Sequence, residues 1–184
     1  MENNFFKDDF FRYTKKKWSL HKYFKYLLFD HGIWYLYLLR RQSTSKAQNN
    51  LLLRFLLKNC TRKYGIEISP ESQIGKGLYL GHAFNIGVNP GAVLGNNVNL
   101  HKGVSIGKEN RGKRKGAPVI GSCVWIGINA TVVGRVSVGN DVLIASNAFV
   151  NVDVPSHSIV IGNPCRIIPH ENATEGYLQN IVDE

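Results

Sequence analysis

The chain has 184 residues, a length that suits one compact domain with an extension. Its net charge is +10. Its three cysteines, Cys60, Cys123 and Cys165, lie far apart in no metal-binding spacing, which excludes disulfide-rich and cysteine–zinc classes. The longest apolar run, residues 33–39, is far shorter than the roughly 20 residues of a membrane-spanning helix. No signal peptide is recognisable, so we expect a cytoplasmic protein that is not an integral membrane protein.

The first third of the chain is basic and aromatic. Residues 1–63 hold 14 Lys and Arg against 4 Asp and Glu, whereas residues 64–184 hold 9 of each. Helical patterning at 18–29, 33–40 and 51–58, with a polar loop at 42–50, predicts a helical segment over residues 1–64.

The charge of residues 1–63 limits the possible partners. Basic, aromatic amphipathic helices are typical of peripheral contact with an anionic membrane surface, here the inner face of the membrane. Packing of these helices on the rest of the protein is the alternative. No recognition motif for nucleic acid accompanies the charge, so we expect no nucleic-acid partner.

A six-residue repeat follows. A period of six suits a short strand followed by an abrupt corner, and Gly and Asn at the corners tolerate the required backbone. Three such strands close a coil of about 18 residues, whose narrow interior admits only aliphatic and small side chains. Chemistry must then occur on the outer faces or between subunits. The repeated aliphatic positions are Ile68, Ile74, Leu80, Ile86, Leu94, Leu100, Ile106, Ile120, Ile126, Val132, Val138, Ile144 and Val150.

This repeat predicts the domain organisation. A β-helix is expected over residues 65–168, with a loop at 108–117 that leaves the prism and a C-terminal tail at 169–184. The chain resembles the hexapeptide-repeat acyltransferases, and within them the serine acetyltransferase-like branch. The resemblance covers residues 66–168 and is carried by Ile66-Glu67-Ile68-Ser69-Pro70, Leu80-Gly81-His82-Ala83, residues 99–107 and the closing segment 154–166.

The resemblance implies a mainly β fold, a left-handed parallel β-helix, which is an exception to the usual right-handed crossover. It also implies homotrimers, with acetyl-CoA as co-substrate in the groove between neighbouring prisms. His82 stands at the position of the catalytic base and Glu67 at that of the carboxylate that orients it. A positioned imidazole suits the chemistry, because an alcohol must lose its proton as it attacks the thioester.

Further site residues are expected around this pair. His101 and Lys102, in the next coil, are candidates for substrate binding, and His101 is also an alternative base or a plain surface residue. The basic loop suggests Asn110 and Arg111 for the acceptor, or for the phosphates of coenzyme A. Cofactor contacts are expected at Gly107, Lys108, Gly127, Ala145 and Arg166.

No metal site is expected, because His82 and His101 lack a closely spaced third histidine. His21, His31, His157 and His170 fall outside any site that the sequence predicts. Free serine needs a carboxylate for its ammonium group and cationic donors for its carboxylate. The serine enzymes carry an acidic residue before the catalytic histidine, where this chain has Gly81, and an Arg-His pair where it has Gly116-Ala117.

These departures favour O-acetylation of a sugar or surface-polysaccharide precursor. Within the branch, the chain is then most similar to the polysaccharide and sugar O-acetyltransferases. Serine O-acetylation, as in cysteine biosynthesis, is the alternative. A third reading, from another class, is a non-catalytic trimeric membrane or scaffold module.

Overall fold

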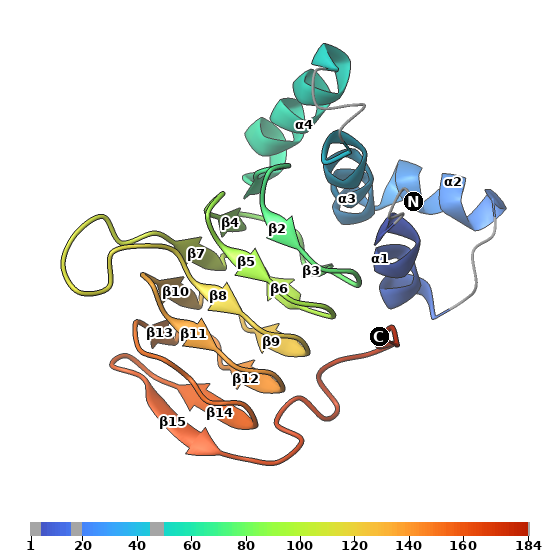
Figure 1. Ribbon diagram of the computed structural model, residues 1–184. Coiled ribbons are helices and arrows are strands. Elements are labelled where there is room, and N and C mark those ends of the chain that lie inside the picture. The colour runs from blue at the N-terminus through green and yellow to red at the C-terminus, as the bar shows by residue number, and fades with distance from the viewer. Residues whose placement is uncertain (1–4, 16–19, 45–49, 184) are drawn as a thin grey trace.

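The computed structural model describes residues 5–15, 20–44 and 50–183, in which helices precede a stack of short strands (Figure 1). The helices are α1 (Phe5–Thr14), α2 (Leu20–Phe29), α3 (His31–Gln42) and α4 (Leu51–Tyr64). The strands are β1 (Glu67–Ile68), β2 (Gln73–Ile74), β3 (Tyr79–Gly81), β4 (Gly87–Val88), β5 (Val93–Leu94), β6 (Asn99–His101), β7 (Ser105–Gly107), β8 (Val119–Ile120), β9 (Val124–Ile126), β10 (Thr131–Val133), β11 (Ser137–Val138), β12 (Val142–Ile144), β13 (Phe149–Val150), β14 (Ser158–Ile161) and β15 (Arg166–Pro169).

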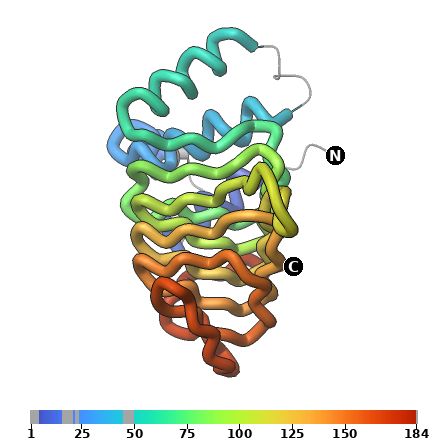
Figure 2. Tube along the Cα trace, turned by 90° about the vertical axis from the view of Figure 1, so that its left-hand side faces the viewer, coloured from blue at the N-terminus to red at the C-terminus, as the bar shows by residue number. Residues whose placement is uncertain are grey.

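The strands form a parallel β-helix with three flat faces, and its coils stack as a prism (Figure 2). Face A contains β1, β4, β7, β10 and β13, and face B contains β2, β5, β8 and β11. Face C contains β3, β6, β9, β12 and β14, with β15 added antiparallel at its end. The chain runs from face A to B to C and back to A, so the expected mainly β solenoid of hexapeptide repeats is confirmed.

The aliphatic positions of the repeat fill the prism. Twelve of the thirteen are buried, and the other, Ile74, is half-buried against the same core. Side chains on a strand alternate between its two sides, so each strand turns one row inward and one row outward. The outward rows therefore hold the residues that are free for chemistry.

The helices cover the first coil, and α3 is their buried centre. Ile33, Leu36 and Leu38 have no exposed surface and belong to the same cluster as Ile66 and Ile68. The Tyr35 hydroxyl, also buried, accepts from the N–H of Ile68 (2.9 Å) and donates to its carbonyl (3.1 Å). These contacts join the helical segment to the β-helix through one continuous core.

The expected helices at 18–29, 33–40 and 51–58 are observed as α2, α3 and α4, although residues 18 and 19 lie outside the described residues. Helix α4 begins after the N-cap Asn50 and ends at Gly65, whose φ of 69° is left-handed. Helix α1 has no counterpart in the patterning of the sequence. Of the part of the chain that the structure describes, no helix is both long and apolar enough to cross a membrane.

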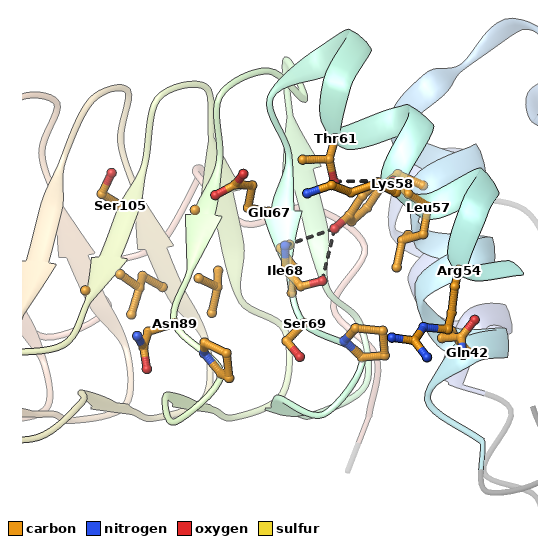
Figure 3. Close-up of a pocket in the computed structure, with 17 residues that line it drawn as sticks. Gln42, Arg54, Leu57, Lys58, Thr61, Glu67, Ile68, Ser69, Asn89 and Ser105 are labelled. Atoms are coloured by element: carbon orange, nitrogen blue, oxygen red, sulfur yellow. Dashed lines mark hydrogen bonds between the residues drawn. The ribbon is translucent and has the colours of Figure 1, made fainter. Parts of the chain in front are cut away.

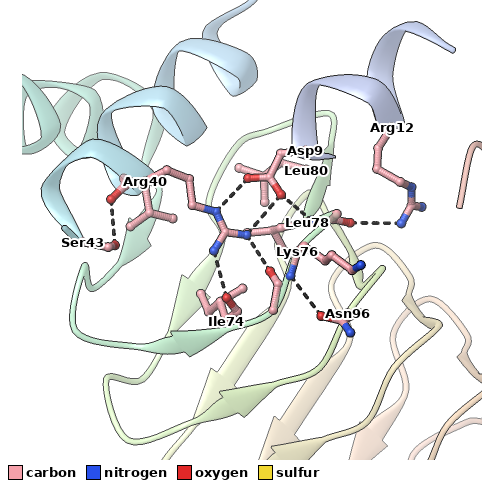
Figure 4. Close-up of polar contacts among 12 residues, drawn as sticks. Asp9, Arg12, Arg40, Ser43, Ile74, Lys76, Leu78, Leu80 and Asn96 are labelled. Atoms are coloured by element: carbon pink, nitrogen blue, oxygen red, sulfur yellow. Dashed lines mark hydrogen bonds and ion pairs between the residues drawn. The ribbon is translucent and has the colours of Figure 1, made fainter. Parts of the chain in front are cut away.

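A buried ion pair fastens α1 to α3 and to the first coil (Figure 4). Asp9, with no exposed surface, accepts from Arg40 Nε (2.8 Å) and Nη2 (3.1 Å) and from the N–H of Leu78 (2.8 Å). Arg40 also donates to the carbonyls of Ile74 (2.9 Å) and Gly75 (2.6 Å). The pair therefore provides hydrogen-bond partners for backbone groups of the first coil that lie beneath the helices.

The C-terminal tail leaves β15 and runs back along face C to the N-terminal helices (Figure 1). Asp141 anchors it, accepting from the N–H groups of Ala173 and Thr174 (both 3.0 Å) and from the Thr174 hydroxyl (2.6 Å). His157 Nδ1 lies 2.9 Å from the same carboxylate. Burial raises the pKa of Asp141, but the hydrogen bonds from Thr174, His157 and Ala173 outweigh it, so the pKa is lowered.

The tail should therefore detach in acid. An Asp whose pKa is lowered by folding stabilises the folded form above its unfolded pKa of about 3.9, and that stabilisation is lost as the pH falls through the lowered value. We expect amide exchange at residues 171–178 to accelerate beyond its intrinsic pH dependence as the pH falls below about 4. Asp141→Asn should show the fast exchange already at neutral pH, whereas Asp153→Asn, at an exposed ion pair, should not. Equal exchange in Asp141→Asn and wild type would contradict this anchor.

Candidate active site

One edge of the prism gathers most of the predicted functional positions. The C–A edge, defined as the corner that follows the face C strands, carries His82, Lys102, Ile128 and Ser146 in successive coils. Their alignment follows from the register, which pairs Gly81 with His101, Leu100 with Ile126, and Ile126 with Ile144. With about 4.8 Å between neighbouring strands, the edge offers a straight row of sites along the prism.

His82 stands at the first of these corners, exposed and with a φ of +50°. A non-glycine residue in the left-handed region persists where surrounding contacts hold it, often at functional sites. The same left-handed backbone recurs at other corners of the prism, as at Asn129 and Asn147. At His82 the flanking residues are in addition held by α1 and α3. The Tyr13 hydroxyl bonds to the N–H (2.8 Å) and carbonyl (3.0 Å) of Leu80, and His31 Nε2 lies 3.0 Å from the Ala83 carbonyl.

Tyr13 and His31 contact the segment around His82, and the sequence did not predict either contact. His31 stacks on Tyr64 with ring centroids 4.3 Å apart and also contacts Phe84, the second residue after His82. The only related feature of the sequence is the basic, aromatic composition of the N-terminal segment. Composition does not predict which aromatic side chain contacts which coil. The helices thus hold the backbone on both sides of His82.

Glu67 lies on face A, in a groove of about 680 Å³ beneath α4 (Figure 3). Lys58 and Arg54 of α4 line the groove from above, and Ser105 lies further along the face. Glu67, Gly87 and Ser105 occupy one outward row, since Gly87 pairs with both of the others. The groove is open, and Glu67 lines it beside the C–A edge.

Glu67 and His82 form no hydrogen bond or ion pair with each other in the structure. Among the residues that the structure describes, neither side chain has a hydrogen-bond or ion-pair partner, and the two lie on either side of the same corner. The assignment of Glu67 as the carboxylate that orients His82 stays a prediction.

His101 faces outward on face C, one coil beyond Gly81 and one before Gly127. Its ring lies 4.7 Å from that of Trp125, centroid to centroid, and its Nε2 is buried without a partner among the described residues. Burial, and next the charge of nearby His82, lower the pKa of His101. His101 is thus a half-buried neighbour of the C–A edge rather than a solvent-facing corner residue.

The predicted loop residues lie elsewhere. Asn110 and Arg111 are exposed on the loop between β7 and β8, whose base is closed by paired hydrogen bonds between Glu109 and Gly116 (both 2.9 Å). This loop, with Gly107 and Lys108 at its start, leaves from the corner between faces A and B. A single chain therefore does not bring these residues to His82, because the width of face A separates the two edges.

Two of the predicted cofactor positions have their backbone groups engaged. The N–H groups of Gly127 and Ala145 donate to Ile144 and Val160 (both 2.8 Å) in the next coil. Their successors on the C–A edge, Ile128 and Ser146, have N–H groups with no partner among the described residues. These outward donors fit a polar, extended ligand along the edge.

Arg166 is exposed at the start of β15, opposite Ile161, at the far end of the same edge. Within the described ranges, no cluster of three or more His, Cys, Asp or Glu side chains is placed to hold a metal ion.

The comparisons with known proteins agree with this architecture. Residues 117–151 match the family model described as bacterial transferase hexapeptide (six repeats). The repeats in this stretch therefore resemble those of the hexapeptide transferases. Serine acetyltransferase 2 of Arabidopsis thaliana is 35% identical over 118 residues, 64% of this chain and 36% of that protein.

Solved structures resemble the chain over a longer stretch. Serine acetyltransferase of Neisseria gonorrhoeae in complex with serine has a TM-score of 0.74 at 27% identity, covering 91% of this chain and 69% of that one. A serine acetyltransferase in complex with CoA has a TM-score of 0.66 at 29% identity, covering 77% and 59%. The chain spans between 36% and 61% of the length of the first curated relatives it matches.

The expectation of a sugar or polysaccharide acceptor is wrong. The relatives named above are serine acetyltransferases, and nothing among them points to polysaccharide synthesis. The structure gives a physical reason for the small residues that suggested it. A Cβ atom on Gly81 would collide with the His101 ring, and one on Gly116 would lie 3.0 Å from Arg135 Cβ at a φ of +138°. Glycine at these positions reflects local packing and says nothing about the size of the acceptor.

Proposed function

We propose that the chain is a serine O-acetyltransferase that moves the acetyl group of acetyl-CoA to the hydroxyl of serine. The observation that carries the proposal is His82, exposed at a strained corner and held by two helices, on a hexapeptide β-helix similar to serine acetyltransferases. A relative solved with serine and another solved with CoA support the two substrates.

In the proposed reaction His82 takes the proton of the serine hydroxyl as its oxygen attacks the thioester carbonyl. The C–O bond forms, the C–S bond breaks, and the proton passes to the departing thiol. Acetyl-CoA supplies the activated acetyl group. General-base catalysis of this kind contributes roughly 10²- to 10⁴-fold. Glu67 is the proposed partner of the imidazolium.

The C–A edge is the proposed seat of acetyl-CoA. Ile128 and Ser146 offer free N–H groups along it, Lys102 lies between them and His82, and Arg166 lies at its far end. Basic side chains at this spacing suit phosphate groups.

We further propose that the active form is a homotrimer. The loop residues Asn110 and Arg111 lie across face A from His82 in one chain, so they can reach a His82 site only in a neighbouring copy. Hexapeptide-repeat transferases are typically trimeric, which supports the proposal. Contact of residues 1–63 with an anionic membrane stays a prediction, motivated by exposed Phe24, Leu28 and Phe29 beside basic residues on α2.

Release of CoA from acetyl-CoA, measured with L-serine and with a panel of sugars and nucleotide sugars, tests the proposed acceptor. We expect saturable release with L-serine and background release with every sugar. Turnover on a sugar without turnover on serine would overturn the proposal.

A further inference from the structure

A small polar cavity of about 180 Å³ lies on face C, apart from the groove beneath α4. Helix α1, face C and the C-terminal tail enclose it, and no carboxylate is among its lining residues. The lining offers mainly hydrogen-bond donors: a guanidinium, an imidazole, an indole, phenols and amides. Its residues are Arg12, Tyr13, Tyr79, Asn99, His101, Trp125, Tyr177 and Gln179.

Arg12 gives the cavity its charge. Its side chain is buried, and it donates to the carbonyls of Gln179 (2.8 Å) and Gly77 (3.0 Å). It also donates to the side-chain oxygens of Asn99 (2.6 Å) and Asn97 (3.4 Å). All of its hydrogen-bond partners are neutral oxygens, and no carboxylate of the described chain lies within ion-pair distance of it. A buried cation normally has an anionic partner, so this charge remains to be neutralised.

His101 contributes a buried polar atom that has no hydrogen-bond partner among the described residues. Its ring lies between Gly81 and Trp125, and its buried Nε2 has no partner among the described residues. Buried polar groups are nearly always hydrogen-bonded, which points to a ligand or water at this atom. Gly81 directly precedes His82, so the cavity adjoins the catalytic corner through a single peptide.

We propose that Arg12 and His101 bind the α-carboxylate of the amino-acid acceptor in this cavity. The inference rests on the proposed function for the identity of the acceptor. The lining matches this ligand, because a carboxylate neutralises Arg12 and accepts from the donors that surround it. The hydroxyl of the acceptor then extends past Gly81 towards His82.

The tail closes the cavity as a lid. The rings of Tyr177 and Trp125 meet edge to face with centroids 5.0 Å apart, and the Gln179 carbonyl accepts from Arg12 Nε. Tyr177 remains half exposed, so this side is the entry that a small ligand can use.

Titration of the full chain with L-serine and with serinol, which has a hydroxymethyl group in place of the carboxylate, tests the inference. Tryptophan fluorescence reports binding, and loss of the signal in Trp125→Phe assigns it to the cavity. Wild type should bind L-serine at least about tenfold more tightly than serinol. His101→Phe keeps an aromatic ring against Trp125. It should weaken the binding of L-serine by roughly 10- to 100-fold, the range of a hydrogen bond to a charged group, with little change for serinol.

The matched control is His21→Phe, on the exposed surface of α2, which should bind L-serine as wild type does. Tyr177→Phe tests the lid side of the cavity without disturbing the buried Arg12. Equal affinity of wild type for L-serine and serinol, or unchanged L-serine binding in His101→Phe, would overturn the inference.

The two proposals fail separately. If His101→Phe still transfers acetyl to serine with the KM of wild type, the cavity does not bind the carboxylate, and the proposed function is unaffected. Binding of L-serine that depends on His101, without any acetyl transfer, removes the proposed function and leaves the carboxylate site.

Discussion

Replacing His82 with alanine should lower kcat by roughly 10²- to 10⁴-fold, the contribution of a positioned general base. The dissociation constant for acetyl-CoA should not change, because the proposed role of His82 is proton transfer rather than cofactor binding. Steady-state kinetics give kcat, and equilibrium titration with CoA gives the affinity. The free energy of unfolding should stay close to wild type, since the His82 side chain is exposed and makes no hydrogen bond to the described chain.

Glu67→Gln should reduce kcat less than His82→Ala, because a partner orients the base without taking the proton itself. His101→Ala is the competing test, since His101 was the alternative base. In our account it raises the KM for serine more than it lowers kcat. A larger loss of kcat in His101→Ala than in His82→Ala would show that the base is misassigned.

Of the substitutions considered, Asp9→Ala should lower the free energy of unfolding the most. The free energy of unfolding should fall by about 3–5 kcal/mol, the usual cost of removing one member of a buried ion pair. Burial raises the pKa of Asp9, and the charge and hydrogen bonds of Arg40 act in the opposite direction. Without Asp9, Arg40 keeps a buried charge whose remaining hydrogen-bond acceptors are the carbonyls of Ile74 and Gly75.

Urea titration measures this loss, and Arg114→Ala is the matched control. The Arg114–Asp153 pair is 3.5 Å long, with side chains 40% and 67% exposed. Exposed pairs are worth about 0–1 kcal/mol, so this variant should unfold close to wild type. A loss in Asp9→Ala no larger than in Arg114→Ala would mean that α1 is not held by its ion pair.

The interior of the protein could be predicted from the sequence, because a narrow prism imposes the same requirement on every coil. Ile68, Leu100 and Val150 stand at equivalent positions and each can be recognised from the others. The position of His82 could be predicted for the same reason. His82 follows the repeated aliphatic position Leu80 by two residues, and this spacing places it at a corner of the prism.

The environment of His82 could not be predicted in this way. Tyr13 and His31 reach Leu80 and Ala83 from 67 and 52 residues away in the chain, and no period connects them. Arg12 was counted only as part of a basic segment, although its contacts are buried.

The acceptor was misjudged at Gly81 for a related reason. From the sequence alone, the missing side chain at Gly81 resembles a lost substrate ligand, whereas in the structure the His101 ring from the next coil fills that space. Such substitutions depend on packing between coils, which a single sequence does not display.

Identification of the acetylated product tests the central claim most directly. The purified full chain, incubated with L-serine and acetyl-CoA labelled in the acetyl group, should yield labelled O-acetyl-L-serine by mass spectrometry, in amounts that His82→Ala reduces by at least about 100-fold. Labelled product that forms equally well with His82→Ala, or no labelled O-acetyl-L-serine from folded wild-type protein, would contradict the account.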